Sequence, residues 1–228
     1  MPTIAGTIVS TGSQAASGRR SFLEVIDELA RPIDADDSTV RALAGDAFRS
    51  AVRTVNRRGL WPWEAMDEDI MLTANNAFST LTSAVKKPLA MHYLNAQGGT
   101  INASIGYTPY PTFLEKYTAD VSGRPHTYTL PNLFETGQVR WFPAPSSTYS
   151  ARFSFYRVTP IPRTDSETIE VPEYALELYM AYAWVEFLKR LPSQQRPFDI
   201  QIAMMEANST FRQMAHHVAS PGDRTREV

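Results

Sequence analysis

The chain has 228 residues and a formal net charge of −2, from 22 basic and 24 acidic side chains. Hydrophobic residues make up 43%, and a chain of this length can bury its own core, which excludes wholesale disorder and the collagen-like and low-complexity classes. The absence of cysteine excludes a disulfide framework, a thiolate nucleophile and a cysteine-ligated metal site. The charge balance also disfavours a protein that wraps nucleic acid through bulk positive charge.

The two ends of the chain have the composition of loose arms. Met1–Gly18 has no charged side chain and consists largely of small and polar residues, so it lacks the basic and apolar regions of a signal peptide. Residues 219–228 are mostly polar and contain proline and glycine. We expect residues 1–20 and 219–228 to be flexible arms without a role in the core.

The most apolar run of the chain is too short and too charged to cross a bilayer. It extends from Tyr174 to Leu188 and is interrupted by Glu177 and Glu186. We therefore expect no contact with a membrane and a soluble protein that is cytoplasmic when made.

Helices are expected first. Ser21 followed by Glu24 is a capping-box signature. Apolar residues follow it at the spacing of a short amphipathic helix. A second helix is predicted over Ser38–Arg58, because one continuous apolar stripe runs along it and basic residues end it. The stripe consists of Val40, Leu43, Ala44, Ala47, Phe48, Ala51, Val52 and Val55.

The middle of the chain, residues 69–158, has the short alternating runs and turn residues that are typical of strands. Two hairpins are predicted, the first joining Ile70–Thr73 to Phe78–Leu81 and the second joining Leu89–Leu94 to Ile101–Ile105. From Tyr149 to Val158 apolar and polar side chains alternate, which predicts a strand with one buried and one wet face.

Helices are expected again at the end. The segment from Glu173 to about Arg190 is apolar around most of its girth, which predicts a helix that is covered on both sides. The last helix, from about Pro197 to Val218, carries apolar residues at alternating spacings of four and three, a heptad seam. Its members are Ile200, Met204, Ala207, Phe211, Met214 and Val218.

This order of elements predicts an α+β fold. The N-terminal helices of residues 21–68 and the C-terminal helices of residues 159–218 are expected to form one helical bundle, because neither half has enough packing partners alone. The β-rich segment 69–158 is expected to protrude from that bundle as an insertion in the middle. Phe48, Val52, Tyr182, Leu188, Phe211 and Met214 are the expected bundle core.

A search for catalytic and ligand-binding patterns finds none. The four histidines lack partners at ligand spacing, and no nucleophile elbow, phosphate loop or dinucleotide fingerprint occurs. The acidic residues Glu64, Asp67, Glu68 and Asp69 lack the ladder of a calcium loop, so a solvated or partner-facing patch is the preferred interpretation. We therefore expect no enzymatic activity, no cofactor and no metal.

One charge pattern stands apart from the rest. Arg49, Arg53 and Arg57 lie four residues apart on one row of the second helix, opposite its apolar stripe, and Arg41 lies two such steps before Arg49. A solvated face is the simplest interpretation. A surface for another subunit or a protein partner comes next, because arginine is enriched in interfaces, and DNA phosphate binding comes third.

Turn and aromatic residues form a longer pattern from Gly123 to Leu191. Its members are Gly123-Arg124-Pro125, Tyr128, Val139, Trp141, Phe142-Pro143-Ala144-Pro145, Tyr149, Phe153, Tyr156, Pro160, Ile169 and Val171-Pro172-Glu173-Tyr174. This pattern resembles the phage head-to-tail adaptor proteins, the tail tubular protein A and tail accessory factor group of short-tailed phages. The match covers under a third of the chain, and the segment Thr73–Phe78 departs from the family by lacking glycine and proline.

The resemblance implies a virion structural protein at the head–tail junction, made in the cytoplasm of a bacterial host. Such a protein forms a homo-oligomeric ring, a dodecamer in the family, that docks on the portal protein and contacts a downstream tail or nozzle protein. It extends the DNA channel, and the genome passes without sequence-specific binding. Arg224, Arg226 and Val228 are the expected portal-docking residues, since adaptor C-termini commonly reach the portal.

Two alternatives stay open. A DNA-binding packaging accessory protein would use the arginine row on phosphate, and its binding would weaken with salt. A small hydrolase would bring a serine, a histidine and an acid together in a pocket.

Overall fold

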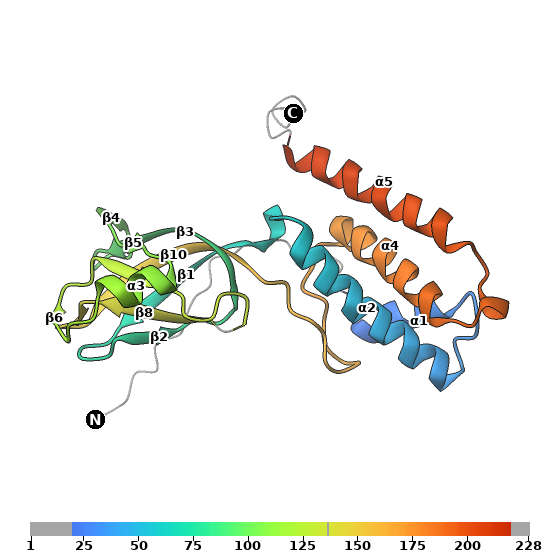
Figure 1. Ribbon diagram of the computed structural model, residues 1–228, viewed down its shortest axis with the longest axis horizontal. Helices are drawn as coiled ribbons and strands as arrows, with labels where there is room; N and C mark the ends of the chain where they lie inside the picture. Colours follow the sequence, from blue (N-terminus) through green and yellow to red (C-terminus); the bar gives the residue numbers. More distant parts are fainter. Residues whose placement is uncertain (1–19, 136, 220–228) are drawn as a thin grey trace. The chain divides into compact units, whose positions relative to one another are not determined.

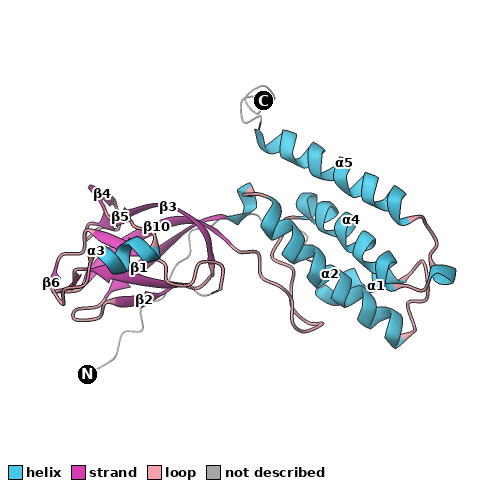
Figure 2. Cartoon of the chain, in the orientation of Figure 1, coloured by secondary structure: helices cyan, strands magenta, loops and turns pink. Residues whose placement is uncertain are grey.

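In the computed structural model, residues 20–135 and 137–219 are described. These residues form two compact units. Residues 64–158 make up the β unit, and residues 20–63 with 159–219 make up the helical unit. Figure 2 colours the helices and strands of the chain, and Figure 1 labels them.

The helical unit contains helices α1 (Phe22–Ala30), α2 (Ser38–Arg58), α4 (Glu173–Arg190) and α5 (Ile200–Ala219). The predicted capping box begins α1, where the Ser21 amide donates to the Glu24 carboxylate and the Glu24 amide donates to the Ser21 hydroxyl. Asp37 caps α2 by accepting a hydrogen bond of 2.7 Å from the Thr39 amide. The bounds predicted for α2 and α4 are confirmed.

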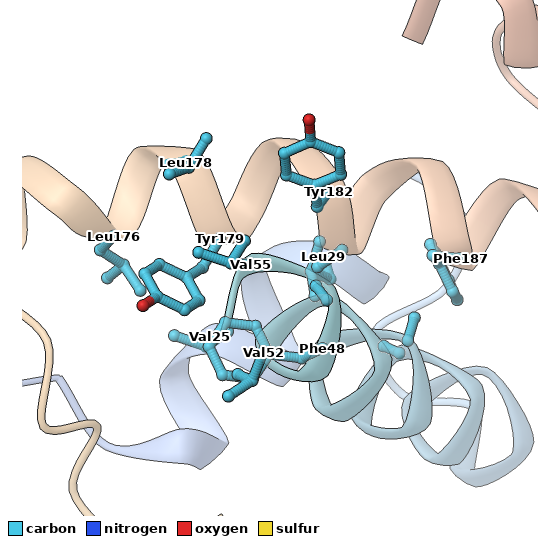
Figure 3. Close-up of a cluster of buried hydrophobic side chains, with 14 of the residues drawn as sticks. Val25, Leu29, Phe48, Val52, Val55, Leu176, Leu178, Tyr179, Tyr182 and Phe187 are labelled. Carbon is cyan, nitrogen blue, oxygen red and sulfur yellow. The ribbon is translucent and has the colours of Figure 1, made fainter. Parts of the chain in front are cut away.

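Helices α2 and α4 supply most of the core of the helical unit. Phe48, Val52 and Val55 of α2 and Tyr179 of α4 are buried, and Figure 3 shows them within one cluster. Helix α4 packs against α2, α5 and α1. This confirms the prediction from its nearly continuous apolar sequence that it is covered on more than one side.

The main sheet of the β unit has the order β1-β10-β3-β4, and all its neighbours are antiparallel. Its strands are β1 (Ala65–Leu72), β10 (Tyr149–Arg157), β3 (Val85–Leu94) and β4 (Thr100–Ser104). In β10, Ala151, Phe153 and Phe155 are buried while the side chains between them are partly exposed, so the predicted alternation is confirmed.

A second sheet has the order β2-β8-β7-β5, and a third consists of two short strands. Their bounds are β2 (Phe78–Thr80), β8 (Gln138–Phe142), β7 (Thr127–Thr129), β5 (Gly106–Tyr107), β6 (Ser122–Gly123) and β9 (Ala144–Pro145). Helix α3 (Tyr110–Lys116) belongs to the same unit, and the strands curl into a half-barrel. Two short 3-10 turns, Pro62–Glu64 and Ser193–Gln195, complete the described elements.

The structure confirms one predicted hairpin and corrects the other. Strands β3 and β4 pair as expected, with His92 opposite Ser104. The first hairpin is wrong, because β1 pairs with β10 and β2 pairs with β8 in the other sheet. The turn after β1 sends the chain from one sheet to the other, and the Asn75 amide there donates to the Pro145 carbonyl at 2.7 Å.

The predicted fold class, a helical bundle with a β-rich insertion, is wrong. The structure is α+β, but its helices are spread out, and the strands form a half-barrel around a hydrophobic core of their own. One of the helices, α3, lies within the β unit.

The heptad seam of α5 shows why a closed bundle is absent. Phe211 and Met214 are only partly buried, whereas the other four expected core residues are buried. Helix α5 packs mainly along α4, yet its seam residue Met204 is 42% exposed, and Ile202 and Met205, which lie outside the seam, are 54% and 70% exposed. Its apolar residues are therefore divided between a contact with α4 and the surface.

Candidate functional site

The predicted arginine row lies on α2, but its members do different things. Arg41 is 3.0 Å from the Asp27 carboxylate of α1 and forms an ion pair with it. Arg53 and Arg57 are exposed, and within the described residues neither forms an ion pair, a hydrogen bond or a ring contact. Only these two of the four arginines therefore remain available for another molecule.

Arg49 ties α2 to the segment before α4. Its Nε donates to the Pro162 carbonyl at 2.9 Å, and its Nη2 donates to the Arg163 carbonyl at 3.1 Å. The guanidinium also lies over the Phe22 ring, 4.9 Å from its centroid, and pairs with Asp46 at 3.1 Å. These contacts give Arg49 a structural role, which the spacing of the row did not reveal.

The neighbouring Arg58, which lies outside the predicted arginine row, links three helices. It donates to the Tyr182 hydroxyl of α4 and, at 3.3 Å, to the Asn208 side chain of α5. Its guanidinium lies 4.7 Å from the Tyr182 ring centroid and 5.6 Å from that of Phe211. Burial raises the pKa of the Tyr182 hydroxyl, and the charge of Arg58 acts in the opposite direction.

The predicted portal-docking residues, Arg224, Arg226 and Val228, lie outside the described residues, as do both predicted arms apart from Arg20 and Ala219. Their role stays a prediction.

A groove of about 550 Å³ opens on the helical unit between α1, α4 and α5. Its floor is apolar and comes mainly from one row of α4, where Met180, Ala181 and Trp184 lie. No residue of α2 lines it. The lining residues are Glu28, Leu29, Pro32, Glu177, Met180, Ala181, Trp184, Glu206, Ser209, Thr210 and Gln213.

The rim of the groove is acidic, with one glutamate from each helix. Glu28 of α1 is paired with Arg20. Glu177 of α4 and Glu206 of α5 are exposed, and in the part of the chain that the structure describes their carboxylates have no hydrogen-bond or ion-pair partner. Two unpaired carboxylates beside an indole ring form a site for cations that have flat or apolar surfaces, such as a guanidinium.

Sequence reasoning missed this groove, although one signal pointed to it. Glu177 interrupts the apolar run of α4, and the next interruption, Glu186, lies elsewhere and binds Lys189 and Arg190. The helices α1 and α5 that complete the groove are far apart in the sequence, so their approach to Glu177 could not be inferred.

Three of the four residues in the acidic group at the start of the β unit make internal contacts, and the fourth, Asp67, is exposed. Glu64 pairs with Lys86 in the interior, and Asp69 pairs with Arg152 on the sheet surface at 2.7 Å. Glu68 accepts hydrogen bonds from the amide and hydroxyl of Thr82. Over residues 20–135 and 137–219, no group of three histidine or acidic residues is placed to hold a metal ion.

Comparison with protein-family models and with curated proteins finds no match for this chain. Among the described helices, none has the length and apolar character that crossing a membrane requires.

Proposed function

We propose that this chain is the subunit of a ring-shaped head-to-tail adaptor in a phage virion. The ring would dock on the portal protein, extend the DNA channel and receive a downstream tail or nozzle protein. Twelve subunits are expected from the resemblance to the adaptor family. The genome would pass through the ring without sequence-specific contacts.

The positions of the motif residues support this proposal. Tyr128, Trp141 and Phe153 are buried together in the β unit, with the Tyr128 ring 5.4 Å from that of Phe153 and 6.2 Å from that of Trp141. They are core residues from three strands of two different sheets. A protein sharing this pattern would therefore share the packing of this unit.

The structure also gives physical reasons for the residue types at the turns of the pattern. A Cβ on Gly123 would lie 3.1 Å from Cγ of Pro143, so the pairing of β6 with β9 leaves little room for a side chain at this position. The Arg124 guanidinium lies 4.3 Å from the Tyr93 ring centroid, and the Tyr93 hydroxyl donates to the Pro125 carbonyl. The "Gly-Arg-Pro" step thus connects the β6–β9 pair to Tyr93 of β3 in the main sheet.

The pattern extends into the helical unit. Pro172 caps α4, where its carbonyl accepts a hydrogen bond of 3.0 Å from the Leu176 amide, and the helix starts at Glu173. One pattern therefore includes core residues of the β unit and the buried Ile169 and Val171 just before α4, and this is the observation that carries the proposal. Since these residues build the fold rather than a catalytic site, a structural role suits them.

Electron microscopy of the full chain mixed with the portal protein of the same virion tests the proposal. We expect a ring stacked coaxially on the portal, visible in negative stain and absent when either protein is omitted. Portal particles that remain bare in the presence of excess chain would overturn it. Salt-dependent binding of duplex DNA by the monomer would instead favour the packaging accessory protein.

A further inference from the structure

We propose that Arg53 and Arg57 of one copy dock in the groove of a second copy, where they pair with Glu177 and Glu206. The inference rests on the proposed function, since it names the contact between neighbouring subunits of the ring. It extends that function by assigning both sides of the contact to residues of this chain.

The basic side of the contact is preformed. Arg53 and Arg57 are exposed on α2 and lie four residues apart, so they occupy one face with an axial separation of about 6 Å. The ion pair of Arg41 with Asp27 holds the start of the same helix, the contacts of Arg49 with the 162–163 carbonyls hold its middle, and Arg58 ties its last turn to α4 and α5. Two guanidiniums are thus presented from a rigid support.

The acidic side matches it in number and in chemistry. Glu177 of α4 and Glu206 of α5 line the groove, and neither carboxylate has a partner within residues 20–135 and 137–219. The floor residues Met180 and Trp184 belong to the same row of α4, which spans about 10 Å from Glu177. Two guanidiniums about 6 Å apart fit that length, and they can stack on the indole while they pair with the carboxylates.

Apolar side chains extend the groove-facing side of α5. Ile202 and Met205 lie one helical turn before Glu206 and Ser209, and they are 54% and 70% exposed. Methionine, tryptophan and arginine are enriched at protein interfaces relative to the rest of the surface. The groove therefore offers both apolar area and unpaired charge to a protein partner.

A second copy of this chain is the occupant that the charges favour. The helical unit carries two unpaired arginines on one surface and two unpaired glutamates on another, and α2 contributes nothing to the groove. A contact between two different patches of identical subunits is heterologous, and repeating it closes a ring when the rotation permits. This is the type of contact that a cyclic adaptor requires.

Disulfide trapping tests the contact directly, because the chain has no cysteine of its own. Purified Arg57→Cys protein is mixed with purified Glu206→Cys protein and oxidised, both in concentrated solution and with portal particles. We expect a covalent dimer that contains one chain of each kind. Arg57→Cys mixed with Asp36→Cys is the matched control, since Asp36 is exposed in the same unit but does not line the groove.

Charge reversal gives an independent measurement. Arg53→Glu/Arg57→Glu protein and Glu177→Arg/Glu206→Arg protein should each lose self-association in sedimentation experiments, and mixing the two should restore it. A cross-link yield equal to that of the control pair, or reversal variants that associate like the unmodified chain, would overturn the inference. If the mixed cysteine variants form rings on the portal but do not cross-link, the inferred contact is wrong and the adaptor proposal still stands. A specific cross-link with bare portals would support the contact and count against the adaptor.

Discussion

The Lys86 ammonium lies 2.7 Å from the Glu64 carboxylate, and both side chains are buried, with Glu64 0% exposed. Burial lowers the pKa of Lys86, and the hydrogen bond and charge of Glu64 act against that shift. Glu64 lies just before β1, and Lys86 lies in β3. In the main sheet β1 and β3 are on opposite sides of β10, so the pair joins two strands that do not pair with each other.

Glu64→Gln should destabilise the β unit by about 3–5 kcal/mol, because it leaves the Lys86 charge buried without its counterion. Urea unfolding followed by circular dichroism measures the change. Glu64→Gln/Lys86→Met removes both charges and should recover most of the loss, since apolar replacements of buried ion pairs are often neutral or stabilising. If the double variant were as unstable as the single one, the unpaired charge of Lys86 would not be the cause of the lost stability.

Two arginines of the α2 row should respond differently to the same substitution. Arg49→Ala removes hydrogen bonds to two carbonyls and the contact with the Phe22 ring, so we expect a loss of about 1–3 kcal/mol in the free energy of unfolding. Arg53→Ala removes no contact seen within one described chain and should stay within about 0.5 kcal/mol of the parent. Equal losses in thermal or urea unfolding would contradict the division of the row.

Burial separates two phenylalanines that the apolar spacing placed in one core. Phe48 is fully buried, so Phe48→Ala should cost about 3–5 kcal/mol. Phe211 is only partly buried and meets the edge of Trp61 at 5.6 Å between centroids, so Phe211→Ala should cost about 1–2 kcal/mol. Equal costs, measured on both variants by urea unfolding, would mean that α5 packs more tightly than its exposure indicates.

These pairs of residues show how far sequence reasoning reaches. The bounds of α2 and α4 could be predicted because each helix buries a periodic or nearly continuous apolar surface. The side chains of Arg49 and Arg53 have the same periodicity. Only the position of the 162–163 carbonyls, more than a hundred residues later, separates their roles.

Strand pairing and the groove were beyond sequence reasoning for a related reason. Leu72 at the end of β1 pairs with Tyr149, so the partner of β1 comes from the far end of the β-rich segment rather than from the next strand. The groove needs α1, α4 and α5 together, and local patterns do not specify how such distant helices meet. The predicted fold class was wrong because the helices are spread out rather than gathered in one bundle, and the strands curl into a half-barrel around a core of their own.

Deletion of residues 219–228 should leave a folded chain that no longer joins the portal. The expected loss follows from the proposed function and from the chemistry of Arg224, Arg226 and Val228, which combine two cations with an apolar side chain. Circular dichroism should stay unchanged, while co-sedimentation with portal particles should be lost. Arg224→Ala/Arg226→Ala should weaken co-sedimentation without abolishing it. Normal joining by the deletion variant would contradict the assignment of these residues to the portal.

Stability at alkaline pH should depend on Tyr128. Burial, followed by the nearby Tyr107, raises the pKa of its hydroxyl well above the ordinary value of 10. In the unfolded chain the hydroxyl ionises near pH 10, whereas in the folded chain it stays protonated to higher pH. The folded state thus binds the proton more tightly, so the stabilisation is complete below about pH 10 and is lost as the pH rises further.

Tyr128→Phe keeps the ring and removes this loss. Near pH 7 the free energy of unfolding of the variant should match that of the parent within about 1 kcal/mol. At about pH 11 the free energy of unfolding of the variant, measured by urea, should exceed that of the parent by up to about 1.4 kcal/mol. Tyr149→Phe is the control, because hydrogen bonds with Ser146 and Ser147 lower the pKa of Tyr149, and its ionisation favours the folded state instead. That variant should gain no alkaline stability. If the free energies of unfolding of the variant and the parent fell in parallel as the pH rises, Tyr128 would have the same pKa in the folded and unfolded states. Its burial would then not cause the loss of stability at alkaline pH.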